Sequence, residues 1–239
     1  MKSGYFAFKK FEVRHTESSM KVGVDAVLLA AWVNLGGQKV LEVGGGCGVI
    51  SLMLAQRYPD AFITAIDIDK GSVRESDYNF NHSPWPGRLK SAELKFPEDV
   101  VCSQDKFDLI ISNPPFFDSG IKNPLTSREK ARHQGDLSVF SLLDHGGEIL
   151  NEGGKLSVIF PADQYHRVKD YAAERGWVIC RECRVRNNIR TPEKRVMIEF
   201  VKGNNGVSEE IEIERVTLFS DGYPTERYRE LCSAFYLKF

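Results

Sequence analysis

Residues 40–54 read VLEVGGGCGVISLML, and this stretch sets the architecture of the chain. A short apolar run enters a turn with four glycines in five positions, and apolar residues then recur at helical spacing. The pattern predicts a strand, a tight loop and a helix in succession. Glycines at such a turn let a ligand approach the backbone at the amino end of the helix, so residues 44–48 are a candidate cofactor loop.

Strands and helices alternate after this unit. Further strands are expected at 62–66, 89–96, 107–112 and 155–160, with a helix at 137–150 closed by Gly153-Gly154 and another running from Asp163, as its cap, to Arg175. Two later strands, at 177–186 and 194–201, have no helix between them, and we expect an antiparallel pair. The alternation predicts an α/β, Rossmann-like fold: a mostly parallel seven-stranded sheet with an antiparallel C-terminal strand and helices on both faces.

The chain is expected to form a single domain over residues 1–239. It divides into an N-terminal extension (1–36), a catalytic core (37–202) and a C-terminal strand–helix addition (207–239). Neither a membrane span nor a signal peptide is expected, and the five cysteines are scattered, which favours a cytoplasmic protein with reduced thiols. Cys180 and Cys183 form a lone Cys-x-x-Cys, so we expect no metal site. The sequence favours a monomer without fixing the oligomeric state.

Positive charge is concentrated in two segments of a nearly neutral chain, whose net charge is −1. Residues 181–195 hold six basic side chains against two acidic ones, and residues 120–133 hold four against one. Both segments fit local contacts with phosphates, and each by itself fits an ordinary solvated surface equally well.

Two carboxylates flank the glycine loop. Asp67 ends the next strand, where it can accept hydrogen bonds from both hydroxyls of a ribose, and Glu42 precedes the glycines, where it suits a ligand with a cationic amino acid end. Val49 stands where a dinucleotide fingerprint would have its third glycine. These features favour S-adenosyl-L-methionine (AdoMet) over a nicotinamide cofactor. We assign the cofactor site to Glu42, Gly44, Gly46, Gly48, Asp67 and Ile68; Glu93 either binds the adenine amine or is a solvated edge carboxylate.

Asn113-Pro114-Pro115-Phe116 follows the strand at 107–112 and is the candidate catalytic loop. An amino nitrogen attached to a π system is a poor nucleophile, because its lone pair is delocalised. The Asn113 side-chain oxygen and the Pro114 carbonyl can accept its two protons and aim the lone pair at a methyl donor beside Asn113. Pro114 holds Asn113 extended, and Phe116 offers a flat face to a planar group. The loop therefore predicts methylation of a planar amine, although such a motif can also simply end a strand.

The whole chain resembles the bacterial tRNA adenine N6-methyltransferases that modify adenine-37 of a valine tRNA. Residues 20–25 look like the family's Lys-Val-Gly-Thr-Asp signature, with Val24 in place of Thr, and the resemblance implies that Lys21 and Asp25 lie over the cofactor. Residues 128–133 resemble the segment after the catalytic loop. Residues 223–237 resemble the closing signature, which Pro224 interrupts.

The resemblance implies AdoMet-dependent methylation of the exocyclic N6 of an adenine in the anticodon arm of a tRNA. A base in a single-stranded loop can be extruded at a cost of a few kcal/mol. The candidate RNA contacts are then Arg128, Arg132, His133, Arg186 and Arg190, although His133 equally fits a structural role.

Other functions share the catalytic loop. The rRNA guanine N2-methyltransferases and protein-glutamine N5-methyltransferases carry the same Asn-Pro-Pro-aromatic motif and remain alternatives. The second group has a helical N-terminal domain, for which 36 residues are too few. A non-catalytic RNA-binding protein with this fold is opposed by the intact Asn113, Asp67 and glycine loop.

Overall fold

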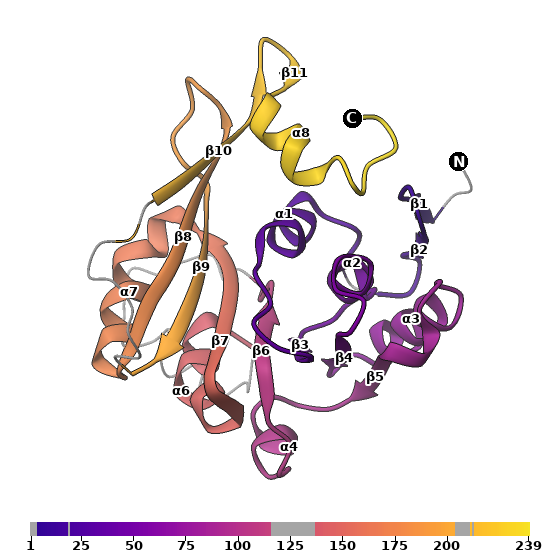
Figure 1. The fold of residues 1–239 in the computed structure, drawn as a ribbon, viewed down its shortest axis with the longest axis vertical. Helices are drawn as coiled ribbons and strands as arrows, with labels where there is room; N and C mark the ends of the chain where they lie inside the picture. Colours follow the sequence, from indigo (N-terminus) through magenta and orange to yellow (C-terminus); the bar gives the residue numbers. More distant parts are fainter. Residues whose placement is uncertain (1–3, 19, 116–136, 204–210, 212) are drawn as a thin grey trace.

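The central feature of the computed structural model is a nine-stranded sheet with the order β11-β10-β8-β9-β7-β6-β3-β4-β5 (Figure 1). The structure describes residues 4–18, 20–115, 137–203, 211 and 213–239. Five strands pair in parallel: β3 (Lys39–Val43), β4 (Phe62–Asp67), β5 (Leu89–Glu93), β6 (Phe107–Ser112) and β7 (Leu150–Pro161). Their carboxyl ends therefore meet at one edge of the sheet, where ligands of open α/β sheets bind.

One antiparallel strand interrupts this arrangement. β9 (Arg195–Lys202) runs antiparallel to β7 on one side and to β8 (Trp177–Asn188) on the other. The predicted seven-stranded core and its antiparallel pair are thus confirmed. Because two antiparallel steps separate β8 from β7, β8 runs in the same direction as β7, and its end at Asn188 lies at the same edge as the end of β6.

The C-terminal addition extends this sheet. β10 (Ile213–Ser220) pairs in parallel with β8, and β11 (Tyr223–Pro224) turns back antiparallel to β10. The last helix, α8 (Glu226–Cys232), then returns over the sheet, where Tyr228 and Cys232 join the apolar cluster around α1. The strand expected in this addition is therefore part of the main sheet.

Helices cover both faces of the sheet, as predicted (Figure 1). One apolar cluster lies under α1 (Val24–Trp32), α2 (Val49–Arg57), α3 (Lys70–Asn81) and α8. The other lies under α4 (Glu98–Val101), α6 (Val139–Ile149) and α7 (Tyr165–Glu174). A small hairpin of β1 (Tyr5–Ala7) and β2 (Glu12–Arg14) lies beside α3. Single 3-10 turns occur at Pro86–Arg88 and Ala162–Gln164.

Two local predictions were wrong. β7 begins at Leu150, because Gly153 and Gly154 lie in an irregular start of the strand where the pairing with β6 shifts register. A Cβ at Gly154 would stand 2.9 Å from the Asn151 carbonyl, so the close backbone approach requires glycine. Asp163 is not a helix cap: it lies within the 3-10 turn, and α7 begins at Tyr165 without a side-chain cap.

Within the described part of the chain, no helix is long and apolar enough to cross a membrane.

Candidate active site

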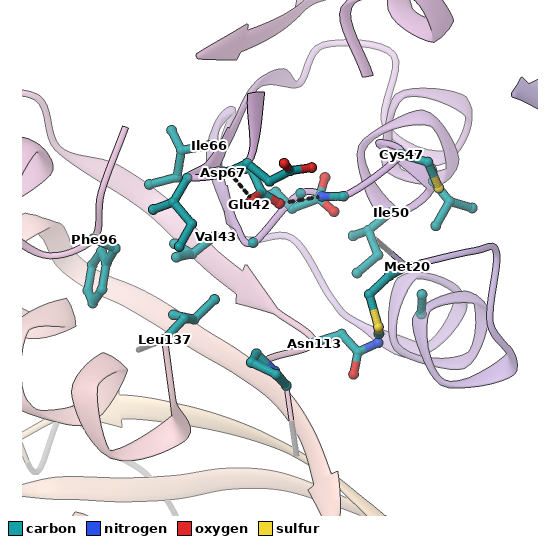
Figure 2. Close-up of a pocket in the computed structure, with 18 of the residues that line it drawn as sticks. Met20, Glu42, Val43, Cys47, Ile50, Ile66, Asp67, Phe96, Asn113 and Leu137 are labelled. Atoms are coloured by element: carbon teal, nitrogen blue, oxygen red, sulfur yellow. Dashed lines mark hydrogen bonds between the residues drawn. The ribbon is translucent and has the colours of Figure 1, made fainter. Parts of the chain in front are cut away.

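A cavity of about 310 Å³ opens at the carboxyl ends of β3, β4 and β6 (Figure 2). Its size is at the lower end of the roughly 300–1,000 Å³ typical of small-molecule sites. The lining residues come from the ends of these strands, the glycine loop, the segment before α1 and the segment after β5: Met20, Lys21, Gly23, Ala26, Glu42, Val43, Gly44, Gly45, Gly46, Cys47, Val49, Ile50, Ile66, Asp67, Ile68, Asp69, Leu94, Phe96, Asn113, Pro115 and Leu137.

The glycine loop is fixed to β4 by its backbone. The N–H groups of Gly44 and Gly45 both donate to the Ile66 carbonyl, at 2.9 and 3.0 Å. Gly48 lies behind the pocket rather than in its lining, with φ of 78°, and a Cβ there would stand 2.5 Å from the Phe80 ring. Glycine is therefore required at this position both for its backbone conformation and for its lack of a side chain.

Asp67 lies at the carboxyl end of β4 and faces the cavity. Its Oδ2 accepts the N–H of Gly46 and its Oδ1 accepts the N–H of Asp69, both at 2.9 Å. Each carboxylate oxygen has a second acceptor site, so Asp67 can hold the loop and still accept ligand hydroxyls. Ile68, also predicted for this site, lines the cavity beside it.

Glu42 is buried at the base of the cavity, with 1% of its surface exposed. Its Oε2 accepts the backbone N–H of Ser51 at 3.0 Å and also the Ser51 hydroxyl. This N–H lies in the first turn of α2, where the N-cap Gly48 has no side chain, so Glu42 takes the part of a cap. Burial raises the pKa of Glu42 to about 8, although the Ser51 bonds oppose this. Sequence reasoning missed the capping, for which Ser51 in the first helical turn was the only signal.

Asn113 places a polar group in the cavity. The Ser112 hydroxyl donates to the Val43 carbonyl at 2.7 Å, which fixes the end of β6 against the glycine-loop strand. The Oδ1 atom of Asn113 is buried and has no hydrogen-bond partner among the described residues. Pro115 also lines the cavity and Pro114 is buried beside it, whereas Phe116 lies outside the described residues.

The N-terminal segment forms one wall. Met20, Lys21 and Gly23 line the cavity, whereas Asp25 lies outside the lining and accepts a hydrogen bond from Arg195 Nε at 2.8 Å. This contact joins the start of α1 to the start of β9.

The wall next to β5 is apolar. Glu93 lies outside the lining, and its carboxylate is 3.7 Å from Lys70 Nζ at the surface. Leu94 and Phe96, which sequence reasoning did not single out, line the cavity instead. Their position just after a parallel strand was the available signal.

Two of the candidate RNA contacts lie at the same edge of the sheet. Arg186 is near the end of β8, and its Nε donates to the Thr217 hydroxyl at 2.8 Å. Arg190 follows in the turn between β8 and β9, with an exposed side chain. Arg128, Arg132 and His133 lie outside the described residues.

The described residues contain no group of three His, Cys, Asp or Glu side chains that could hold a metal ion. Cys180 and Cys183 are free thiols, and Cys180 Sγ contacts the Glu199 carbonyl at 3.3 Å.

Residues 18–169 match the family model of the methyltransferase small domain. A Bacteroides thetaiotaomicron protein named tRNA1(Val) (adenine(37)-N6)-methyltransferase is 36% identical to this chain over 99% of both chains. Proteins of the same name from Vibrio vulnificus and Trichodesmium erythraeum are each 35% identical; both matches cover 100% of this chain, and 98% and 100% of the relative.

Solved structures share the fold at lower identity. A methyltransferase from Pyrococcus furiosus has a TM-score of 0.58 and 20% identity, covering 81% of this chain and 89% of its own. A T. thermophilus 16S rRNA N2 methyltransferase in complex with AdoMet and guanosine has a TM-score of 0.57 and 17% identity, covering 84% of this chain and 50% of its own. Both are similar to this chain in the arrangement of the sheet and helices.

Proposed function

The chain belongs to the methyltransferase small domain family and to the tRNA1(Val) (adenine(37)-N6)-methyltransferases within it, and from this premise we propose that it methylates the exocyclic N6 of adenine-37 in a valine tRNA, with AdoMet as the methyl donor. Its site of action would be the cytoplasm, where tRNA is found.

The observation that carries the chemistry is the unpartnered Oδ1 of Asn113. A buried acceptor without a partner costs about 1–3 kcal/mol. An amide oxygen in a ligand cavity recovers this cost when a bound group donates an N–H to it. An amine of a planar base is such a group, and we propose that Asn113 orients it by accepting one of its protons. The amine attacks as a neutral group, so no general base is needed before the methyl transfer.

The other lining residues fit AdoMet. When bound, AdoMet supplies an electrophilic methyl group. Asp67 would hold its ribose hydroxyls, and Glu42 would pair with its ammonium group. The apolar walls suit an adenine ring: Ile68, Leu94, Phe96 and Leu137.

The substrate class rests on charge and on the names of the relatives. Arg186 and Arg190 place positive charge at the edge of the sheet on which Asn113 lies. Such side chains bind phosphates and orient an RNA without reading its sequence. An adenine in the anticodon loop is unpaired, so it can reach the cavity at low cost.

The test is methylation of defined RNAs. The purified protein is incubated with methyl-labelled AdoMet and an unmodified valine tRNA transcript, and the RNA is digested and analysed by mass spectrometry. We expect N6-methyladenosine at position 37, and no label in a matched transcript with guanine at that position. Label that appears only in rRNA or in a protein acceptor would refute the tRNA assignment.

A further inference from the structure

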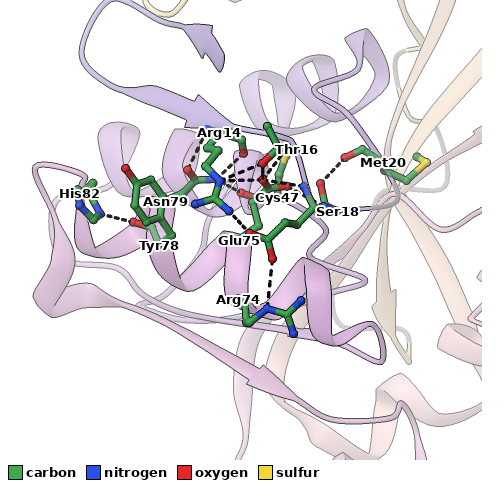
Figure 3. A network of polar contacts seen from close by, with 11 residues as sticks. Arg14, Thr16, Ser18, Met20, Cys47, Arg74, Glu75, Tyr78, Asn79 and His82 are labelled. Atoms are coloured by element: carbon green, nitrogen blue, oxygen red, sulfur yellow. Dashed lines mark hydrogen bonds and ion pairs between the residues drawn. The ribbon is translucent and has the colours of Figure 1, made fainter. Parts of the chain in front are cut away.

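A buried carboxylate on α3 holds the segment that leads into the cofactor cavity (Figure 3). Glu75 is fully buried, and its Oε1 accepts the backbone N–H groups of Thr16 and Glu17 at 2.5 and 3.0 Å. Its Oε2 accepts the N–H of Ser18 at 2.8 Å. Three successive backbone N–H groups thus converge on one side chain, an arrangement that binds anions well. We call residues 14–18 the N-terminal strap.

These bonds outweigh the cost of burying a charge. Burial by itself would raise the pKa of Glu75, but the hydrogen bonds from Ser18 and Thr16 hold it below its usual value. Arg14 adds an ion pair, with its Nε 3.4 Å from Glu75 Oε1. Glu75 is therefore an ionised anchor for the strap.

Asn79, one helical turn further along α3, joins the strap to the glycine loop. Its Oδ1 accepts the N–H of Arg14 at 2.9 Å. Its Nδ2 donates to the carbonyls of Arg14 and Cys47, both at 2.8 Å. Cys47 belongs to the glycine loop and lines the cavity. The same face of α3 thus fixes two walls of the cavity relative to each other.

The strap passes this position on to the residues of the wall. The Ser18 hydroxyl donates to the Met20 carbonyl at 2.9 Å, and the Val22 N–H donates to His15 Nδ1 at 3.3 Å. Met20 and Lys21 line the cavity between these two contacts.

The hairpin that precedes the strap is held separately. Phe8 stacks on Phe11 with ring centroids 4.7 Å apart and on Tyr236 at 5.9 Å, and the Lys9 N–H donates to the Phe235 carbonyl at 2.8 Å. Loss of the Glu75 contacts would therefore release the strap while the hairpin stays attached to the C-terminal segment.

We propose that Glu75 and Asn79 are positioning residues for the cofactor, which hold Met20 and Lys21 against the glycine loop. This inference rests on the AdoMet site of the proposed function, and it concerns cofactor binding rather than the identity of the RNA.

The test is calorimetric titration of the full chain with AdoMet in the variant Glu75→Gln. This change keeps the shape of the side chain but turns one acceptor oxygen into an NH2 group that faces N–H donors. The matched control is Glu199→Gln, because Glu199 is equally buried and accepts the Asn34 N–H at 2.7 Å and Lys155 Nζ at 3.0 Å, outside the cavity. Both variants are expected to melt at lower temperature than the wild type. Only Glu75→Gln is expected to raise the Kd for AdoMet, by tenfold or more, with Glu199→Gln within twofold of the wild type.

Hydrogen exchange of the wild type gives a second measurement that does not depend on a variant. AdoMet is expected to slow exchange at the amides of Thr16, Glu17 and Ser18, although none of them lines the cavity. An equal effect of both Gln variants on Kd, no effect of Glu75→Gln, or unchanged exchange at these amides would overturn the inference. A wild-type protein that binds no AdoMet would instead refute the proposed function.

Discussion

Replacing Asn113 with alanine separates catalysis from stability in this protein. The change removes the acceptor that we propose orients the amine, while the cofactor-binding residues on β3 and β4 stay in place. Removal of one pre-organised polar group of this kind costs about 10²–10³ in kcat, or about 2.7–4 kcal/mol. We therefore expect turnover to fall by at least roughly a hundredfold, with little change in the Kd for AdoMet.

The effect on stability has the opposite sign. Asn113 Oδ1 is buried without a partner among the described residues, which costs the folded state about 1–3 kcal/mol. Asn113→Ala removes that cost and loses some packing. We expect the free energy of unfolding of the cofactor-free protein to be unchanged or to rise by up to about 2 kcal/mol, as measured by urea denaturation.

Ser157→Ala is the matched control. Ser157 Oγ is likewise buried without a described partner, but it lies within β7, away from the cavity. This variant is expected to gain stability by about 1 kcal/mol and to keep wild-type turnover. An Asn113→Ala protein that keeps more than about a tenth of its turnover, or that loses more than about 2 kcal/mol of stability, would show that Asn113 has a structural rather than a catalytic role.

Three further changes test other parts of the site. Burial raises the pKa of Glu42 to about 8, so this side chain is mostly neutral below that pH and pairs poorly with an ammonium group. The ratio of AdoMet affinities, wild type over Glu42→Gln, should therefore rise with pH up to about 8; calorimetry at several pH values checks this, and a flat ratio would contradict it. The ratio is used because the α-amino group of the cofactor itself titrates near about 7.7–8.0. Gly48→Ala forces a Cβ to within 2.5 Å of the Phe80 ring at a φ of 78°, so it should cost more than about 1 kcal/mol of stability and weaken AdoMet binding, whereas an unchanged melting temperature would refute the steric argument. The double change Arg186→Ala and Arg190→Ala should raise the KM for tRNA and reduce its salt dependence by about 0.7–0.9 per lost phosphate contact, with unchanged AdoMet binding; an unaltered slope would remove these residues from the RNA site.

Local periodicity was sufficient to find the core strands. Each strand of the core is a short apolar run bounded by polar or turn residues, and buried parallel strands have this pattern whatever surrounds them. The position of Asn113 followed from the same reasoning, because a loop that follows a parallel strand lies at the carboxyl edge of the sheet.

Local periodicity was insufficient for α1. This helix is apolar on nearly every side, and its residues from Ala26 to Trp32 are buried, so no amphipathic pattern marks it. It lies between the sheet helices and α8 and carries the pocket residue Ala26. The start of β7 was misplaced for a related reason: Gly153 and Gly154 suggest a turn, but pairing with β6 draws them into the strand.

The site divides in the same way. The residue types that carry the chemistry, Asn113, Asp67 and the glycine loop, were evident from the sequence because each stands next to a strand whose pattern is local. Their hydrogen bonds were not, since a bond such as that from Thr16 to Glu75 joins residues 59 positions apart. Which carboxylate anchors the strap, which one caps α2 and which amide oxygen stays without a described partner depend on what packs around each group. Burial and hydrogen-bond satisfaction are non-local properties, so the chain order specified the chemical groups, and folding assigned each of them its partners.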